Sequence, residues 1–140
     1  MFEMKVKFVE EELRKLRNYL EENCIAYGFI HSSDGELESI ALSIKIDSLP
    51  CSMFRYKLAE EIAKRYGVQC YIDCDNWAED RSPDELEYSI RYGIACSKEE
   101  EIEKAVRKLV NAKNDLEKTL EKTSRKLLDQ INLRIPSTYL

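Results

Sequence analysis

Two aspartates separated by one residue form the one arrangement in this sequence that could carry metal chemistry. Asp73 and Asp75 end an alternating run of apolar and polar residues, and Glu79 and Asp80 follow closely. Two carboxylates on one strand face lie about 7 Å apart, and Mg²⁺ could bridge one of them to a substrate phosphate. This spacing would suit Mg²⁺-dependent phosphotransfer or nuclease activity. The alternative is a solvated acidic turn at the end of a strand.

Other kinds of catalytic site lack their residues. His31 is the sole histidine, and it stands beside an expected hairpin turn with no serine or cysteine placed to use it as a base. No Gly-rich phosphate loop occurs. The cysteines are odd in number and include no Cys-x-x-Cys pair, which argues against a zinc site and favours small core residues in a reducing cytoplasm. They are Cys24, Cys51, Cys70, Cys74 and Cys96.

A second arrangement points to binding. If the bulky residues of the expected strands face covering helices, the other sheet face carries mostly small residues, which allow something to approach the backbone closely. These small residues are Ala26, Gly28, Ser32, Ser39, Ala41, Ser43, Ser89, Gly93 and Ala95; the larger groups among them are Lys45, Tyr71, Arg91 and Ile30. A subunit, the N-terminal helix or a flat nucleobase could lie there. The opposite register of the first hairpin strand would instead present Tyr27, Phe29 and His31.

The aromatic and basic residues suit single-stranded nucleic acid, because bases stack on aromatic rings and phosphates pair with cations. The net charge of −5 hides an asymmetry: residues 73–103 hold 11 acids and three bases, whereas residues 104–126 hold eight bases and three acids. A local basic stripe can therefore act despite the acidic total. The candidate contacts are Tyr71, Trp77, Arg91, Lys45, Lys104, Arg107 and Lys108.

Hydrophobic periodicity predicts the elements that position these residues. Strands are expected where apolar and polar residues alternate: 25–32, 37–46, 68–75 and 86–96. Helices are expected over 10–23, from a cap at Asp47 or Ser48 with Pro50 in the first turn to Gly67, and over 97–131. The Asp-Gly pair within 33–36 is a hairpin signal. Residues 2–8 fit either a first strand or a backward extension of the first helix.

The order (β)αββαββα predicts an α+β fold, with an antiparallel-rich sheet covered by helices on one face and followed by a long C-terminal coiled-coil-like helix. If residues 2–8 form a strand, residues 2–75 have the order of a ferredoxin-like unit. Residues 1–110 are expected to form the domain, and residues 111–140 a projecting helix and tail that mediates assembly.

The last helix has a heptad seam. A capping box of Ser97 and Glu100 should begin it. Its apolar residues recur at spacings of four and three, with Lys113 and Thr123 at two further seam positions: Ile102, Val106, Leu109, Leu116, Leu120 and Leu127. We expect a homo-oligomer, such as a homodimer, through Leu109, Leu116, Leu120 and Leu127. The alternative is that the seam packs on its own domain.

A compact αββαββ domain followed by a leucine-rich zipper from Ile102 to Leu127 resembles the layout of the ThermoDBP family of archaeal single-stranded-DNA-binding proteins. The resemblance covers most of the chain as architecture, without a shared motif, so it assigns no functional residue. It implies DNA binding by the N-terminal domain and dimerisation through the last helix. The acidic segment 73–87 departs from it.

A second resemblance is local: residues 88–102 are similar to the last strand and helix of fold-type I aminotransferase small domains. The large domain that would hold the cofactor and its lysine has no room in 140 residues, so that chemistry is set aside.

We therefore expect a non-enzymatic, single-stranded nucleic-acid-binding protein without a cofactor. A protein-assembly adaptor is the alternative, and the acidic Mg²⁺ site is the second alternative. No apolar run approaches the length of a membrane span or a signal peptide, so a cytoplasmic protein is expected. The Lys- and Glu-rich composition, with 35% charged residues, suits a thermophile.

Overall fold

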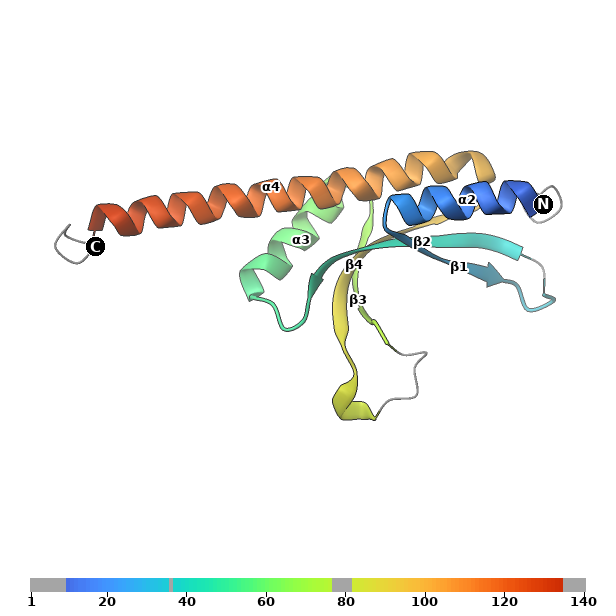
Figure 1. The fold of residues 1–140 in the computed structure, drawn as a ribbon, viewed down its shortest axis with the longest axis horizontal. Helices are drawn as coiled ribbons and strands as arrows, with labels where there is room; N and C mark the ends of the chain where they lie inside the picture. Colours follow the sequence, from blue (N-terminus) through green and yellow to red (C-terminus); the bar gives the residue numbers. More distant parts are fainter. Residues whose placement is uncertain (1–9, 36, 77–81, 135–140) are drawn as a thin grey trace.

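A computed structural model describes residues 10–35, 37–76 and 82–134 and confirms the α+β prediction. A four-stranded antiparallel sheet is covered by three helices on one side, and none of the described helices lies on its other face (Figure 1). The elements in chain order are α2 (Glu10–Glu22), β1 (Ile25–His31), β2 (Leu37–Ser48), α3 (Met53–Tyr66), β3 (Gln69–Cys74), the short 3-10 helix η1 (Pro83–Glu85), β4 (Tyr88–Cys96), a second 3-10 turn η2 (Glu99–Glu101) and α4 (Ile102–Arg134). The expected strand at residues 2–8 lies outside the described residues.

The strand order is β1-β2-β4-β3, with every neighbouring pair antiparallel. A ferredoxin-like unit over residues 2–75 would need its first strand between β2 and β3. That place is occupied by β4, which pairs with both, so the ferredoxin-like interpretation of residues 2–75 is wrong. The predicted alternation of faces is correct, because β1, β2 and β4 turn Ile25, Ile44 and Tyr92 toward the helices.

Local sequence explains the turns around α3. Gly67 ends the helix in the left-handed conformation (φ 70°), as expected for a glycine C-cap. The start differs from the prediction: Ser52 is the N-cap, and its Oγ accepts a hydrogen bond from the Arg55 backbone N–H at 3.1 Å. Asp47 and Ser48 instead belong to β2, which keeps pairing with β4 past the expected strand end and so delays the helix.

The core lies between the sheet and the three helices. Tyr92, at the centre of β4, is fully buried, and its hydroxyl donates a 2.6 Å hydrogen bond to the Ala59 carbonyl of α3. Tyr66 at the end of α3 donates to Asp115 of α4 at 3.0 Å. The first bond satisfies a polar group inside the apolar core, the second lies at its partly exposed margin, and together they tie α3 to β4 and α4.

The long helix α4 follows η2, and here two predictions need correction. The turn begins at Lys98 without a side-chain cap, so the capping box of Ser97 and Glu100 is not formed. The helix also stays packed in the core beyond the predicted boundary at residue 110, because Ala112 and Leu116 are buried there and Leu120 packs against it. Leu109 and Leu116 are therefore used inside their own chain and are not available to a second copy.

The distal part of α4 projects past the sheet and α3 (Figure 1). Leu127 is exposed there, together with its neighbour Leu128. Coiled-coil pairing through Leu120 and Leu127 stays a prediction. Among the described helices, none has an apolar stretch long enough to span a bilayer.

Candidate ligand groove on the open sheet face

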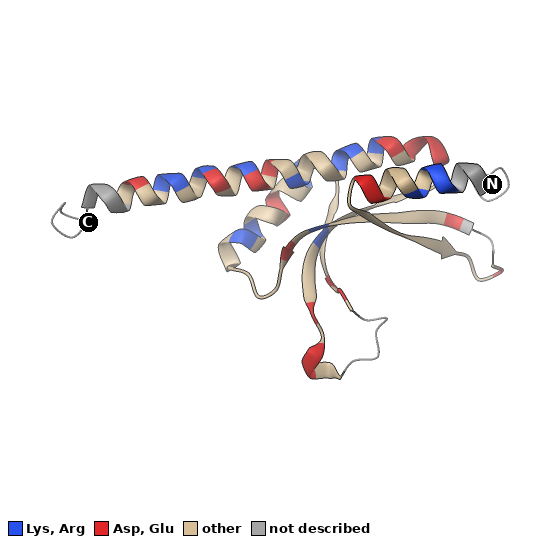
Figure 2. Cartoon of the chain, viewed as in Figure 1, with Lys and Arg blue, Asp and Glu red and all other residues tan. Residues whose placement is uncertain are grey.

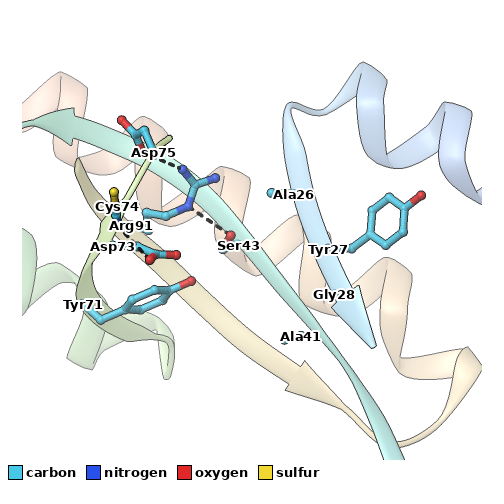
Figure 3. A pocket seen from close by; sticks show the side chains of 10 residues that line it. All are labelled: Ala26, Tyr27, Gly28, Ala41, Ser43, Tyr71, Asp73, Cys74, Asp75 and Arg91. Carbon is cyan, nitrogen blue, oxygen red and sulfur yellow. Dashed lines mark hydrogen bonds and ion pairs between the residues drawn. The ribbon is translucent and has the colours of Figure 1, made fainter. Parts of the chain in front are cut away.

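The face of the sheet opposite the helices is hollowed into a groove of about 370 Å³. It crosses all four strands, because small side chains on β1 and β2 form its floor and larger groups on β3 and β4 form one wall (Figure 3). The floor residues are Ala26, Gly28, Ala41 and Ser43, and the wall residues include Tyr71, Asp73, Asp75 and Arg91. The predicted face of small residues therefore exists, and no described helix covers it.

Tyr71 lies across β4 at the one position where a side chain is missing. A Cβ atom built on Gly93 would approach the Tyr71 ring carbon Cε1 to 2.7 Å, which is closer than atoms of neighbouring side chains pack. The Tyr71 ring therefore packs directly against the backbone of Gly93, as expected where a glycine in a strand allows close approach. The ring is half-buried and forms a flat apolar surface beside the groove.

Arg91 is held on the groove wall by two neighbours. Its Nε donates to Ser43 Oγ at 3.1 Å, and its Nη1 lies 3.7 Å from Asp75 Oδ1. Only 15% of the Arg91 side chain and 19% of the Asp75 side chain are exposed. An ion pair this sheltered from water is screened less than a surface pair.

Asp75 is the shared partner of this cluster. Lys45 Nζ donates to Asp75 Oδ2 at 3.1 Å, and Ser89 Oγ donates to Asp75 Oδ1 at 2.5 Å. Partial burial opposes ionisation of the carboxyl, but the hydrogen bonds from Ser89 and Lys45 and the charges of Lys45 and Arg91 outweigh it and lower the Asp75 pKa below its usual value. The carboxylate is therefore charged at neutral pH and compensates both cations.

Hydrogen bonds and ion pairs already engage both aspartates of the pair in this structure. Both Asp75 oxygens already accept hydrogen bonds, and one Asp73 oxygen accepts from the Cys74 backbone N–H at 2.8 Å. Within the described ranges, no group of three or more His, Cys, Asp or Glu side chains is placed to hold a metal ion. Asp75 is a counter-ion of Lys45 and Arg91 in this structure.

A residue that was not predicted from the sequence, Asn76, supports this end of the groove. Asn76 is buried directly after β3, where its amide donates to the Glu85 carbonyl at 3.0 Å and its Oδ1 accepts from the Glu87 backbone N–H at 2.9 Å. Asn76 therefore joins the two ends of the loop that carries the chain from β3 to β4. An asparagine directly after a strand is a known turn signal and could have indicated this role.

The structure separates the other predicted contacts. Trp77 lies outside the described residues. Lys104, Arg107 and Lys108 belong to α4, on the helix-covered side, so they do not share a surface with Tyr71 and Arg91 (Figure 2). Arg107 pairs there with Glu103 at 3.4 Å, and Lys104 and Lys108 line a smaller hollow of about 200 Å³ beside the end of β4.

The alternative register for the first hairpin strand is wrong. Tyr27 stands opposite buried Leu42 and Phe29 opposite buried Ile40, so both aromatic side chains belong to the helix-covered side of β1. Figure 3 shows the Tyr27 ring beyond β1, pointing away from Tyr71 and Arg91. Tyr27 borders the groove at its β1 end, but its ring points out of it, so Tyr71 is the lining aromatic residue that lies beside Arg91.

Comparisons with known proteins add no family to this description. No protein-family model, curated protein or solved structure matches the chain.

Proposed function

We propose that the groove on the open sheet face binds single-stranded nucleic acid. The observation that carries this proposal is the position of Tyr71, whose ring packs closely against Gly93. Arg91 is its cross-strand neighbour on β4, and Lys45 follows on β2 as the next cation along the same face. A base would stack on the ring, and the adjoining phosphate would pair with the cations. The ligand class is the one that the ThermoDBP resemblance implies.

Physical chemistry supports this ligand for three reasons. Unpaired bases commonly stack on aromatic residues of an open sheet, whereas the bases of a double helix are already paired and stacked and are not free to do so. The small floor residues Ala26, Gly28 and Ala41 leave room for a flat ring to approach the backbone. Ser43 and Tyr71 add hydroxyl groups that can bond to sugar or base edges.

The negative charge of Asp75 limits the affinity. A phosphate that approaches Arg91 and Lys45 must compete with the carboxylate that already holds them. More acidic residues follow at the β3–β4 end of the sheet, where Figure 2 shows Asp and Glu near η1. We therefore expect a nucleic-acid strand bound in the groove to extend from Tyr71 toward β1, away from the acidic residues near η1. Its affinity should be modest.

The decisive experiment is a fluorescence-anisotropy titration of labelled oligo-dT at low salt. Replacing Tyr71 with alanine should weaken binding about 5- to 150-fold, because stacking of a base on an aromatic ring is worth about 1–3 kcal/mol. Tyr88→Ala is the matched control, since Tyr88 is an exposed tyrosine on the helix-covered side. Equal effects of the two substitutions would remove the groove as the binding site.

Asp75→Asn tests the competition directly. The amide keeps the size of the side chain and removes its charge, so Arg91 and Lys45 become available and the affinity for oligo-dT should rise about three- to tenfold. Asp73→Asn is the control, because it removes the same charge from the groove without breaking either ion pair. An equal gain in both variants would reflect only net charge, and a loss in Asp75→Asn would contradict the proposed contact.

A protein-assembly adaptor is the second candidate. It is favoured by the exposed Leu127 and Leu128 on the projecting part of α4. A pull-down that recovers one stoichiometric protein partner and no nucleic acid, and that fails after Leu127→Glu, would support this alternative.

A further inference from the structure

Strand β1 forms one edge of the sheet, and this edge is unusually exposed. It pairs with β2 on one side, and no strand among the described residues pairs with its other side. Three large side chains on it remain open to solvent: Tyr27 is 36%, Phe29 45% and Ile30 42% exposed. The backbone N–H and C=O groups along a free edge are a template for another strand.

The features that normally protect such an edge are missing from β1. Its sequence, Ile25–His31, contains no Lys, Arg, Asp, Glu or Pro, and its only irregularity lies at the far end, between Ile30 and His31. The opposite edge, β3, carries Asp73, which protects it from pairing. The two edges of the sheet therefore differ in their tendency to accept a strand.

We propose that β1 pairs antiparallel with β1 of a second copy of this chain, around a two-fold axis that passes through Gly28. In this register the positions 27 and 29 face each other, so Tyr27 of one copy meets Phe29 of the other, twice. Ala26 meets Ile30 in the same way. Within one chain, Tyr27 and Phe29 already make an edge-to-face contact, with ring centroids 6.0 Å apart, and the pairing extends this contact into a four-ring cluster.

The absence of charge on β1 argues against a charged partner at this edge and leaves the contact itself free of like-charge repulsion between two copies. Each copy carries a net charge of −5, so two copies repel one another over most of their surface. Residues 25–30 carry no charge, so this edge lets two copies meet without opposing like charges at the contact. A nucleic acid or a basic protein would gain no ion pair there.

The available area sets the expected strength. An aromatic side chain has a surface of about 150–250 Å², so exposed fractions near 40% for Tyr27, Phe29 and Ile30 leave about 250 Å² per copy to bury, in addition to the strand edge. The total lies below the 1,200 Å² or more that is usual for a stable interface. The dimer is therefore weak, and it forms at micromolar or higher concentration.

Pairing through β1 would join the two open faces on the same side of a continuous eight-stranded sheet. Gly28 and Ala26, which form the floor of the groove at its β1 end, would then lie beside their symmetry mates. The two grooves would meet across the axis and present one longer surface. The association itself does not require a ligand.

The test is sedimentation of the purified, reduced protein over a concentration series from about 1 µM to about 1 mM, without nucleic acid. The native chain should change from monomer to dimer within this range. Tyr27→Lys should raise the dissociation constant at least tenfold, because it places an ammonium group against Phe29 of the other copy. Ile72→Lys, at an equally exposed position on the β3 edge, should leave it unchanged.

A double substitution tests the register. Tyr27→Lys combined with Phe29→Glu places opposite charges face to face and should restore the dimer, whereas Tyr27→Lys combined with Phe29→Lys should not. Circular dichroism confirms that each variant is folded. A native chain that stays monomeric, equal behaviour of the two double variants, or a dimer that is broken by Leu127→Glu and not by Tyr27→Lys would each overturn the proposal.

Discussion

Asp75 shows how a single carboxylate can change the chemistry of a site. By sequence it is half of a possible Mg²⁺ pair; in the structure it accepts hydrogen bonds from Lys45 and Ser89 and lies beside Arg91. It keeps a half-buried guanidinium compensated on an open sheet face, since an uncompensated charge there would be costly. A ligand must therefore offer a stronger anion than Asp75 or bring stacking energy from Tyr71.

Gly93→Ala tests how Tyr71 is held. The added methyl group would lie 2.7 Å from the ring carbon Cε1 of Tyr71, so the Tyr71 ring must move away from this position. We expect a loss of about 1–3 kcal/mol in the free energy of unfolding, measured by urea denaturation, together with weaker oligonucleotide binding. Gly28→Ala is the control for the stability measurement, because a Cβ there meets no atom within 4 Å. A Gly93→Ala protein that is as stable as the control would show that the ring does not depend on this glycine.

The raised pKa of the Cys70 thiol leads us to expect a loss of stability at alkaline pH. Burial is the main cause that raises the pKa of its thiol to about 11, with smaller contributions from Glu60 and Cys51. A pKa that is higher in the folded state stabilises the protein below the unfolded value of 9.0, and this contribution is lost as the pH rises from 9.0 toward 11. Cys70→Ala should therefore lose less stability than the native chain between pH 8 and 11, as measured by urea denaturation at each pH. Parallel curves would contradict the burial argument.

At the scale of elements, α4 serves two purposes along its length. Its first half closes the core through Leu109, Ala112 and Leu116, while its distal half lies beyond the sheet. The heptad spacing continues through both halves, because a stripe with this period suits packing on a sheet as well as on another helix. Only the tertiary structure shows where the part of α4 that packs in the core ends and the projecting part begins.

Replacing two leucines of the same seam with alanine should therefore have different effects on the free energy of unfolding. Leu116→Ala removes a buried side chain and should lower the free energy of unfolding by about 2–5 kcal/mol. Leu127→Ala changes an exposed position and should alter it by at most about 0.5 kcal/mol in the monomer. Similar costs for both substitutions, in urea denaturation at low protein concentration, would show that Leu127 is also packed in the folded unit.

Short-range signals predicted most of the fold. Alternation placed the four strands and their faces correctly, and Gly67 marked the end of α3, because both features depend on neighbouring residues. The start of α3 and the place of β4 between β2 and β3 were not predictable in this way, since each depends on which distant strand pairs with β2.

The same contrast holds for the candidate site. The face of small residues, with Lys45, Tyr71 and Arg91 on it, followed from alternation alone. The ion-pair cluster around Asp75 did not, because it joins β2, β4 and the end of β3 through contacts between residues up to 30 positions apart. The role of Gly93 also becomes visible only when Tyr71 is placed on it.

At the scale of the whole molecule, the charges divide the surface. The basic residues of α4 lie on the helix side and acidic residues gather near η1 (Figure 2). On the open face, Arg91 lines the groove and Lys45 lies next to it on β2, and both are paired with Asp75. Phosphates of a nucleic-acid strand bound on the open face would therefore pair with two cations, Arg91 and Lys45. Counterion release at two phosphates predicts that the logarithm of the binding constant falls with the logarithm of salt concentration with a slope of about −1.4. A much steeper slope in anisotropy titrations would indicate that α4 also takes part.

Nucleic-acid binding on the open sheet face can be decided by an anisotropy titration of labelled oligo-dT at low salt with the native chain and with Tyr71→Ala. We expect saturable binding by the native chain and a 5- to 150-fold weaker interaction for the variant, as a loss of about 1–3 kcal/mol of stacking requires. No binding by the native chain at tens of micromolar protein, or equal binding by the variant, would contradict the assignment of the open sheet face to single-stranded nucleic acid.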